Sequence, residues 1–425
     1  MKRQAAPLGL ATLDDKPQDA LEPSASKPLA IEKWLLSKFL LAAGNPAASV
    51  ELWDGQEIKV TPDKPCTRLR IADRNALLRL MFHPDLEFGE LYTTGRVRVD
   101  GDLLSLIETV TRASSKHKAL GWSRLLSSLY LLRSNTLSRA RHNIYHHYDI
   151  GNDFYRLWLD AQMLYTCAYF PTASATLEQA QIAKMDHVSR KLRLQPGDEV
   201  VEAGCGWGAL ALHMAQHYGV RVKAYNISKE QLAYARERAS REGMADRVEY
   251  IEGDYREIQG QFDVFVSVGM LEHVGLKHYR TLGAVMDRCL KPQGRGLIHS
   301  IGRNRPAPMN AWIEKRIFPG AYPPALSEMA DLFEPWCFSI LDVENLRLHY
   351  AETLRHWLAR YEAHVEQIGN MFDAQFVRAW RLYLAGSIAA FSQGELQLFQ
   401  VLFNRYDDNH IPLTREHLYG ARPPS

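Results

Sequence analysis

The chain of 425 residues is 46% hydrophobic and 24% charged, and its formal net charge at pH 7 is +2. Such a chain can bury a full core, and we expect it to divide into two or three domains. Its five cysteines are widely separated and form no CxxC pair, which argues against both a disulfide framework and a zinc site. Because no apolar run approaches the ~18 uncharged residues of a membrane span, we expect a cytoplasmic protein.

Residues 1–30 are rich in Pro, Ala, Ser and Asp and predict a disordered tail. The following segment, 31–110, predicts a small α+β domain. Its patterns indicate a helix in IEKWLLSKFLLAAG, a hairpin in SVELWDGQEIKV that turns at Asp54-Gly55, a strand in TRLRIAD, and helices in NALLRLMFHP and DLLSLIETVTRA.

The segment 111–142 is strongly basic, because no acidic residue lies between Glu108 and Asp149. Apolar residues at helical spacing, with arginines interspersed, predict an amphipathic helical linker. A solvated helix face and a nucleic-acid patch are the alternatives, but no nucleic-acid-binding motif accompanies the charges. An apolar stripe beside arginines suits an anionic membrane surface better, so we expect contact with anionic phospholipid and none with nucleic acid.

From about residue 143 onward, predicted strands alternate with predicted helices, which is typical of parallel βαβ units in an α/β domain. Two further strands are predicted late in the chain, in FSILDVENLRL and ELQLFQVLFNR. Ligands of such sheets bind at the carboxyl ends of the strands. The loop after Glu202 lies at one of these ends.

Three glycines in that loop, Gly204, Gly206 and Gly208, follow a predicted strand and open a predicted helix, so a ligand can approach the backbone closely. The spacing ExGxGxG is neither the dinucleotide pattern GxGxxG nor a P-loop. Taken alone, the loop is also compatible with a tight turn that binds nothing. The segments GDYRE and SVGMLEHVG, which follow the third and fourth strands, favour a ligand. Together with the loop, they resemble the class I methyltransferases, which bind S-adenosylmethionine.

A closer resemblance covers nearly all of residues 143–425. Seven blocks occur in the order found in the cyclopropane-fatty-acyl-phospholipid synthases and their mycolic-acid relatives: HYDIGNDFYRLWLD, MLYTCAYF, AGCGWG, SVGMLEHVG, LIHSIG, IFPG and HYAETL. Residues 31–110, with DLEFGELYTTGRVRVDGD, resemble the accessory amino-terminal domain of the bacterial phospholipid enzymes. The resemblance implies an α/β, Rossmann-like class I methyltransferase fold with a mixed seven-stranded sheet. It also implies a catalytic domain over 143–425 with a substrate-covering insertion at about 303–395.

The family resemblance implies transfer of a methylene group from S-adenosylmethionine to the cis double bond of an unsaturated phospholipid acyl chain, giving a cyclopropane fatty acid. A bound bicarbonate ion would deprotonate the intermediate carbocation. Two alternatives stay open: a methylene- or methyl-branched product formed by loss of a different proton, and a non-catalytic lipid-binding protein that has kept the fold. We expect a peripheral protein at the inner face of the membrane. The sequence leaves the oligomeric state open, with a homodimer as one candidate.

By the same resemblance, Glu202 is the acidic anchor at a strand end, and the glycines of the loop line the methionyl end of the cofactor. Three residues of the segment before the sheet are implied to close over the cofactor: Tyr148, Tyr165 and Thr166. The ribose is implied to contact Asn226 and Gln231, and the adenine to contact Asp254 and Tyr255. Many methyltransferases carry an acidic residue where this chain has Asn226, a departure that bears on cofactor affinity rather than on cofactor identity.

The chemistry requires alignment, exclusion of water, a cavity that tolerates a cation, and a base, because an isolated alkene is a poor nucleophile. Glu272 and His299 lie near the ends of the fourth and fifth predicted strands. The resemblance implies that these two side chains and Tyr350, with the backbone near Cys167 and Ile301, hold the bicarbonate ion.

Each of these residues also has a plainer interpretation. Cys167 is expected to line the site rather than to act as a covalent nucleophile, because an isolated alkene is not an electrophile. His299 could be an ordinary core histidine, and Glu272 could cap the helix that follows it. The LIHSIG block and the position beside a sulfonium cofactor favour function for both. No metal site is expected, because acidic or cysteine partners at ligand spacing are lacking for His273, His278 and the His146–His147 pair.

Overall fold

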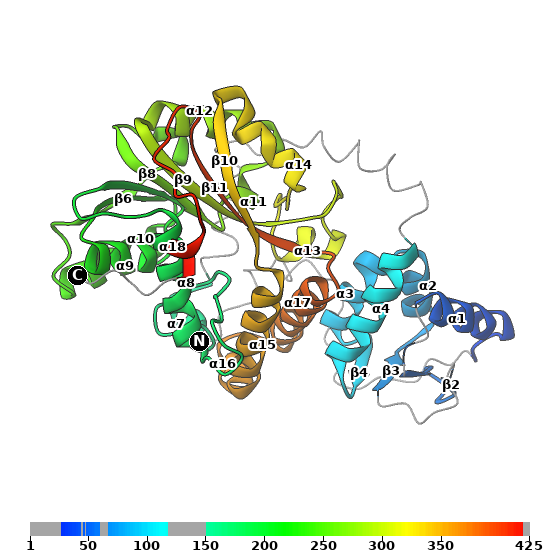
Figure 1. The fold of residues 1–425 in the computed structure, drawn as a ribbon. Coiled ribbons are helices and arrows are strands. Elements are labelled where there is room, and N and C mark those ends of the chain that lie inside the picture. Colours follow the sequence, from blue (N-terminus) through cyan, green and yellow to red (C-terminus); the bar gives the residue numbers. More distant parts are fainter. Residues whose placement is uncertain (1–26, 44–45, 47, 60–66, 118–149, 420–425) are drawn as a thin grey trace. The chain divides into compact units, whose positions relative to one another are not determined.

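The computed structural model describes residues 27–43, 46, 48–59, 67–117 and 150–419 (Figure 1). Most of the predicted disordered tail and of the basic linker lies outside the described residues, as does Tyr148. The chain forms two compact units. The first contains Met1–Leu129, Pro308–Pro319 and Leu354–Glu395, and the second contains Tyr130–Ala307, Gly320–Thr353 and Leu396–Ser425.

Four short strands form the sheet of the first unit, in the order β2-β1-β3-β4. They are β1 (Ala48–Glu51), β2 (Glu57–Lys59), β3 (Thr67–Ile71) and β4 (Val97–Asp100). The predicted hairpin is confirmed, because β1 and β2 pair antiparallel around a turn in which Gly55 has a φ of 81°. Asp54 Oδ1 accepts the Gln56 N–H at 3.1 Å and stabilises this turn.

Helices pack their apolar faces against this sheet. They are α1 (Ala30–Ala42), α2 (Arg74–Phe82), α3 (Pro84–Thr94) and α4 (Leu103–His117). Their buried leucines, among them Leu36, Leu77 and Leu91, form one cluster with Val50 and Ile71 of the strands. The helices predicted for this part of the chain are therefore confirmed.

Later segments of the chain complete the first unit. These are α13 (Ala311–Arg316), the part of α15 (Arg347–Ala363) from Leu354 onward, α16 (Val365–Met371) and α17 (Ala374–Ser392). Helix α17 packs against α3 and α4. Phe372, Phe376 and Trp380 stack in series, with ring centroids 4.0 Å and 5.6 Å apart, and all three are fully buried. These three aromatic residues are core residues.

The second unit is built on a seven-stranded sheet of order β10-β11-β9-β8-β5-β6-β7. Its strands are β5 (Glu199–Ala203), β6 (Arg221–Asn226), β7 (Val248–Glu252), β8 (Phe262–Val268), β9 (Leu290–Gly302), β10 (Phe338–Asn345) and β11 (Gln397–Arg405). Neighbours from β7 to β9 are parallel, whereas β11 runs antiparallel to both β9 and β10. This is the mixed seven-stranded α/β sheet that the sequence predicts.

Helices cover both faces of this sheet (Figure 1). They are α7 (Asn152–Arg156), α8 (Leu177–Lys191), α9 (Ala209–Tyr218), α10 (Lys229–Arg241), α11 (Leu271–Val274), α12 (Tyr279–Cys289), α14 (Leu326–Met329) and α18 (Glu416–Tyr419). Val200 and Leu297 pack in a core with residues of α8, α9 and α10, whereas Val201 and Ile298 pack in another core with residues of α12. Consecutive strand residues thus face opposite layers. In the described parts of the chain, no helix combines the length and apolar character needed to cross a membrane.

A buried ion pair within the first unit gives a test of its packing. Arg316 of α13 donates to both carboxylate oxygens of Glu90 on α3, each at 2.8 Å, and both side chains are almost completely buried. Glu90→Gln should lower the free energy of unfolding by about 3–5 kcal/mol, because Arg316 would stay buried without its counter-charge. Denaturant unfolding measures this loss.

The exposed pair of Arg241 and Glu237 provides the control. Glu237→Gln should change the free energy of unfolding by less than about 1 kcal/mol. Equal effects of the two substitutions would contradict the packing of α13 against α3.

Candidate functional site

The residues expected to bind and react lie at one edge of the second sheet, where the parallel strands β5 to β9 end. Glu202 is near the end of β5, and Asn226 is the last residue of β6. Asp254 follows the edge strand β7, Glu272 follows β8, and His299 lies near the end of β9. Since β5 lies between β8 and β6, the loop after it separates the group at Asp254 from the group at Glu272 and His299.

The glycine loop after β5 needs left-handed backbone at alternate positions. Gly204, Gly206 and Gly208 have φ values of 85°, 53° and 83°. A Cβ atom on Gly208 would lie 2.4 Å from Tyr250 Oη, so packing alone requires glycine there. A Cβ on Gly206 would meet no atom within 4 Å. Packing therefore leaves open space next to the backbone of Gly206, where a ligand can approach.

Asn226 holds the glycine loop in place. Its Nδ2 donates to the Gly206 carbonyl at 3.1 Å and to Gln231 Oε1 at 2.8 Å, and its Oδ1 accepts from the Ile227 N–H at 2.8 Å. Gln231 is buried in the first turn of α10, whose N-cap is Ser228. The two residues assigned to the ribose by resemblance are thus bonded to each other and to the loop.

Asp254 and Tyr255 open a short 3-10 helix, Tyr255–Glu257, after β7. Asp254 is buried and accepts from Arg256 Nε at 2.6 Å and Nη2 at 3.0 Å. The Tyr255 hydroxyl is buried without a hydrogen-bond partner, and burial raises the pKa of Tyr255 to about 12. The aromatic ring and its unbonded hydroxyl can contact a planar, polar ligand at this end of the sheet.

Tyr165 and Thr166 belong to a segment that lies beside the strand ends. The Tyr165 ring packs 5.3 Å from Trp158. Thr166 lies against the first residue after β8, because a Cβ on Gly269 would be 3.2 Å from the Thr166 methyl group. Thr166 Oγ1 accepts a hydrogen bond from Lys184 Nζ at 2.9 Å. These contacts bring the segment to the same edge of the sheet as the glycine loop.

Lys184 and Glu202 are buried, and neither has an ion pair within 4 Å among the described residues. Burial lowers the pKa of Lys184 to about 8, although Asp160, Cys167 and Glu202 raise it in part. Burial raises the pKa of Glu202 to about 7, with Lys184 opposing that shift. One oxygen of Glu202, Oε2, has no hydrogen-bond partner. A buried carboxyl group with a free oxygen suits a role as anchor for a polar ligand.

Cys167 is fully buried, with its thiol 3.1 Å from the Ala168 carbonyl. Burial raises the pKa of Cys167 far above its ordinary value, so the thiolate form is suppressed. The next residue is tied to the start of α15, because the Ala168 N–H donates to Thr353 Oγ1 at 3.0 Å. Tyr350 is buried one turn earlier on the same helix. Cys167 and Tyr350 are thus held in neighbouring segments.

Glu272 and Ile301 are in direct contact. The Ile301 N–H donates to Glu272 Oε1 at 2.5 Å, while Glu272 Oε2 is buried without a partner. Burial raises the pKa of Glu272 to about 7, against the lowering effect of the hydrogen bonds that it accepts. Glu272 lies inside α11, and the N-cap is Met270, so the interpretation of Glu272 as a helix cap is wrong.

His299 lies two residues before Ile301 on β9. Its Nδ1 is 3.0 Å from Gln400 Nε2 on β11, and burial together with nearby Lys184 and Lys191 lowers the pKa of His299 to about 3. The imidazole is therefore neutral across the physiological pH range. Among the predicted catalytic residues, Glu272 and the backbone N–H of Ile301 are joined by a direct hydrogen bond.

Sequence reasoning missed a row of buried polar side chains on α8. Gln181, Lys184, His187 and Lys191 are each at most 1% exposed, and their spacing places them on one face of the helix. Gln181 and Lys184 contact Thr166, while His187 and Lys191 contact Glu344 of β10. The polar residues at this spacing in LEQAQIAKMDHVSRK were the available signal.

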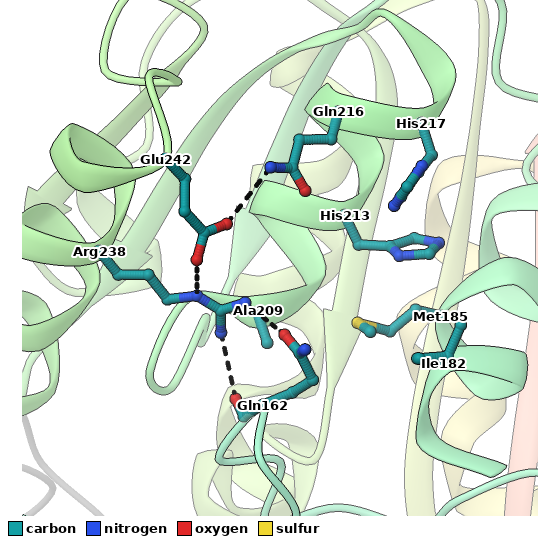
Figure 2. A pocket seen from close by; sticks show the side chains of 9 residues that line it. All are labelled: Gln162, Ile182, Met185, Ala209, His213, Gln216, His217, Arg238 and Glu242. Atoms are coloured by element: carbon teal, nitrogen blue, oxygen red, sulfur yellow. Dashed lines mark hydrogen bonds and ion pairs between the residues drawn. The ribbon is translucent and has the colours of Figure 1, made fainter. Parts of the chain in front are cut away.

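A cavity of about 220 Å³ is lined by residues of α8, α9 and α10 and by Gln162. Figure 2 shows Arg238 bonded to Glu242 and Gln162 at its wall, with Glu242 also bonded to Gln216. Its nine lining residues include none of those predicted from sequence to bind or react. Arg238, Glu242, Gln162 and Gln216 are joined by hydrogen bonds there, while His213 contacts Asp186. In the described parts of the chain, no group of three or more His, Cys, Asp or Glu could hold a metal ion.

Two family models match the chain. One, described as mycolic acid cyclopropane synthetase, matches residues 135–401, and the other, a domain of unknown function (DUF7884), matches residues 35–119. The probable fatty acid methyltransferase of Pseudomonas putida is 37% identical over 382 residues, which cover 87% of this chain and 95% of that protein. The cyclopropane-fatty-acyl-phospholipid synthase of Escherichia coli K12 is 42% identical over 270 residues, which cover 63% of this chain and 69% of that protein.

A solved structure supports the same assignment. The mycolic acid cyclopropane synthase CmaA1, complexed with SAH and CTAB, is 29% identical and aligns with a TM-score of 0.60 over 62% of this chain and 98% of its own. Residues 135–401, which match the cyclopropane synthetase family model, contain the seven-stranded sheet as far as β11 and the strand ends described above. The chain therefore belongs to the mycolic acid cyclopropane synthetase family of S-adenosylmethionine-dependent methyltransferases.

Proposed function

We propose that this enzyme transfers a methylene group from S-adenosylmethionine to the cis double bond of unsaturated phospholipid acyl chains, forming cyclopropane fatty acids. The observation that carries the proposal is the contact between Glu272 and Ile301. It places a buried carboxyl group, with one oxygen held and the other unpartnered, at the strand ends near the glycine loop. The names of the relatives in Escherichia coli and Pseudomonas putida support a lipid acyl substrate.

The residues at the strand ends suit S-adenosylmethionine. The open space at Gly206 fits close approach of a ligand to the backbone, and the unpartnered oxygen of Glu202 offers an acceptor to its polar end. Tyr165 and Thr166 would cover the methionyl part, and Asp254 and Tyr255 would meet the adenine. When bound, the cofactor supplies an electrophilic methyl group. Asn226 and Gln231 would act by holding the loop and by offering amide groups to the ribose.

The reaction needs a base after the alkene has attacked the methyl carbon. A carbocation then forms on the acyl chain, and the ring closes when the transferred methyl group loses a proton. With its pKa near 7, Glu272 is partly protonated at neutral pH, and the proton must lie on Oε2 because Oε1 accepts from Ile301. A protonated carboxyl group can donate to an anion. We therefore propose that Glu272, His299 and Tyr350 hold a bicarbonate ion that accepts the proton.

A methyl- or methylene-branched product is the second candidate. It requires the same cofactor and the same cation but loss of a different proton. The relative in Pseudomonas putida that aligns with 87% of this chain is named a probable fatty acid methyltransferase, which favours keeping this candidate. The two outcomes differ in how the cation is quenched, so the position of the base decides between them.

We further propose that the enzyme works as a peripheral protein at the inner face of the membrane, since its substrate would be part of a bilayer. The acid-free segment 111–142 supports this, because each Lys or Arg near an anionic surface contributes about 1 kcal/mol to binding. We also propose the domain organisation that the sequence resemblance implies: an accessory domain over 31–110, and a catalytic domain over 143–425 with an insertion at about 303–395 that would cover the substrate.

The first functional prediction concerns cofactor binding. Gly206→Val should abolish binding of S-adenosylmethionine, because a branched side chain would fill the open space beside the backbone. Gly243→Val is the matched control, since Gly243 has a similar φ of 69° and also has no atom within 4 Å of a Cβ. Both variants carry the backbone strain of a left-handed valine, but only the first should fail to bind in calorimetry. Near-normal affinity in Gly206→Val would reject the assigned loop.

The second prediction concerns the base. Glu272→Gln should reduce methylene transfer to unsaturated phospholipid vesicles by ~100-fold or more at trace bicarbonate, the usual size of a general-base contribution. Added bicarbonate should restore part of this loss, because glutamine still offers a donor at the position of Oε2. The wild-type rate should also fall when bicarbonate is depleted. A wild-type rate indifferent to bicarbonate would remove the ion from the proposal and leave a side chain as the base.

The third prediction uses stability instead of activity. The pKa of Glu272 is raised to about 7 from 4.5, so the folded protein holds this proton more tightly than the unfolded chain does. Its stabilising contribution is therefore complete below pH 4.5 and is lost as the pH rises through about 7. Glutamine does not titrate, so in carbonate-free buffer Glu272→Gln should gain stability relative to wild type across this window, by about 3 kcal/mol at pH 8. A difference in unfolding free energy that does not change with pH would contradict the burial of Glu272.

A further inference from the structure

A chain of buried polar groups leads from β10 to the imidazole of His299. Glu344 Oε2 accepts a hydrogen bond from Lys191 Nζ at 2.6 Å. Lys191 Nζ also donates to Gln400 Oε1 at 2.8 Å, and Gln400 Nε2 lies 3.0 Å from His299 Nδ1. Lys191, Gln400 and His299 are each at most 2% exposed.

The strands make this alignment possible. Gln400 of β11 and His299 of β9 are directly paired across the antiparallel ladder. Leu402 and Leu297 each lie two residues away on the same strands, and both pack in the core with residues of α8. His299 and Gln400 therefore face the layer from which Lys191 projects.

The hydrogen bonds from Lys191 through Gln400 to His299 have a fixed donor-to-acceptor direction, which Lys191 sets. An ammonium group has three donors and no acceptor, so the amide atom that it contacts must be the oxygen. The Gln400 amide is thereby fixed, and its nitrogen faces the imidazole as a donor. His299 Nδ1 must then accept, which leaves the proton of the neutral ring on Nε2, away from Gln400.

Glu344 favours the charged form of Lys191, at the start of the hydrogen-bonded series. Its Oε2 also lies 2.6 Å from His187 Nε2. Burial raises the pKa of Glu344, but the hydrogen bonds from His187 and Lys191 outweigh this effect and lower it to about 2. Burial lowers the pKa of Lys191, but the ionised Glu344 opposes this shift through charge and a hydrogen bond, and so favours the ammonium form that the direction of the hydrogen-bonded chain requires.

We propose that Lys191 and Gln400 are positioning residues that hold His299 in the Nε2-protonated tautomer, so that His299 is a hydrogen-bond donor in the reaction and not its base. The inference rests on the proposed function for the role of His299. With Nδ1 engaged and Nε2 already protonated, the imidazole has no free lone pair to accept a proton from the carbocation. It can donate to an anion that does so.

Gln400→Glu reverses the chain with little change in size. A carboxylate can accept from Lys191 as before, but toward His299 it can only accept, so the ring proton should move to Nδ1. We expect ¹⁵N spectra of histidine-labelled protein to show Nε2-protonated His299 in the wild type and Nδ1-protonated His299 in this variant. The His299→Gln spectrum assigns the signals. We expect turnover of Gln400→Glu to fall by ~100-fold while its affinity for S-adenosylmethionine stays near that of the wild type.

Two further variants keep the test decisive. Gln400→Met removes the hydrogen bond without adding a charge, and it should give a mixture of both tautomers and an intermediate turnover. Gln397→Glu is the matched control on the same strand, because its Oε1 accepts from Asn345 Nδ2 at 2.9 Å, as a carboxylate also can. This control should keep the wild-type His299 spectrum and turnover.

An Nδ1-protonated or doubly protonated His299 in the wild type would overturn the inference. So would wild-type turnover in both Gln400 variants. The spectra need no substrate, so they test the tautomer alone. A wild type that shows the expected tautomer but transfers no methylene group to phospholipid would overturn the proposed function instead.

Discussion

Burial of ionisable side chains at the carboxyl ends of the strands is the constraint on which the rest of this site depends. Glu202 and Glu272 are removed from water, and each keeps one oxygen without a partner. Such groups are unfavourable for stability, because the charged form is poorly solvated and the neutral form leaves hydrogen-bonding capacity unused. Their pKa values are consequently raised to about 7. A site built in this way is poised to bind polar ligands and to hold protons near neutral pH.

Helix α8 links the two halves of this arrangement. The two polar residues nearer its amino-terminal end, Gln181 and Lys184, hold the segment around Thr166 beside the glycine loop. Nearer its carboxyl-terminal end, His187 and Lys191 bond to Glu344. Lys191 also bonds to Gln400, which in turn contacts His299. One buried face of a single helix therefore supports both the expected cofactor loop and the expected reaction centre. Movement of α8 would disturb the expected cofactor loop and the expected reaction centre at once, so both depend on the rigidity of this helix.

The fold was predictable because its signals are local. Apolar patterns predicted the seven strands of the second sheet and three of the four strands of the first, and Asp54-Gly55 predicted the hairpin, whereas β4 was missed. The glycines at alternate positions indicated the loop, since left-handed backbone at Gly204, Gly206 and Gly208 can be recognised from residue type. The grouping of 354–395 with the amino-terminal sheet could not be predicted, because those contacts join segments more than 200 residues apart, for example Arg378 and Thr93.

The polar chemistry was predictable only in part. Glu272 follows β8 and His299 lies near the end of β9, so their position in the sequence indicated the site. The row on α8 was missed because Lys184, His187 and Lys191 resemble the solvated face of a surface helix, and only the packing reveals that this face is turned inward. Whether Asn226 and Gln231 bond to each other is equally a matter of side-chain geometry.

In the proposed reaction, ring closure requires a base that removes a proton from the transferred methyl group. The most direct measurement is the mass spectrum of fatty acids from a host that expresses this enzyme and is fed methionine with a fully deuterated methyl group. Removal of one deuteron from the transferred group predicts a new cyclopropane fatty acid that retains two of the three deuterium atoms. A methyl-branched product that retains all three would contradict it, because the transferred group would then have lost nothing to a base.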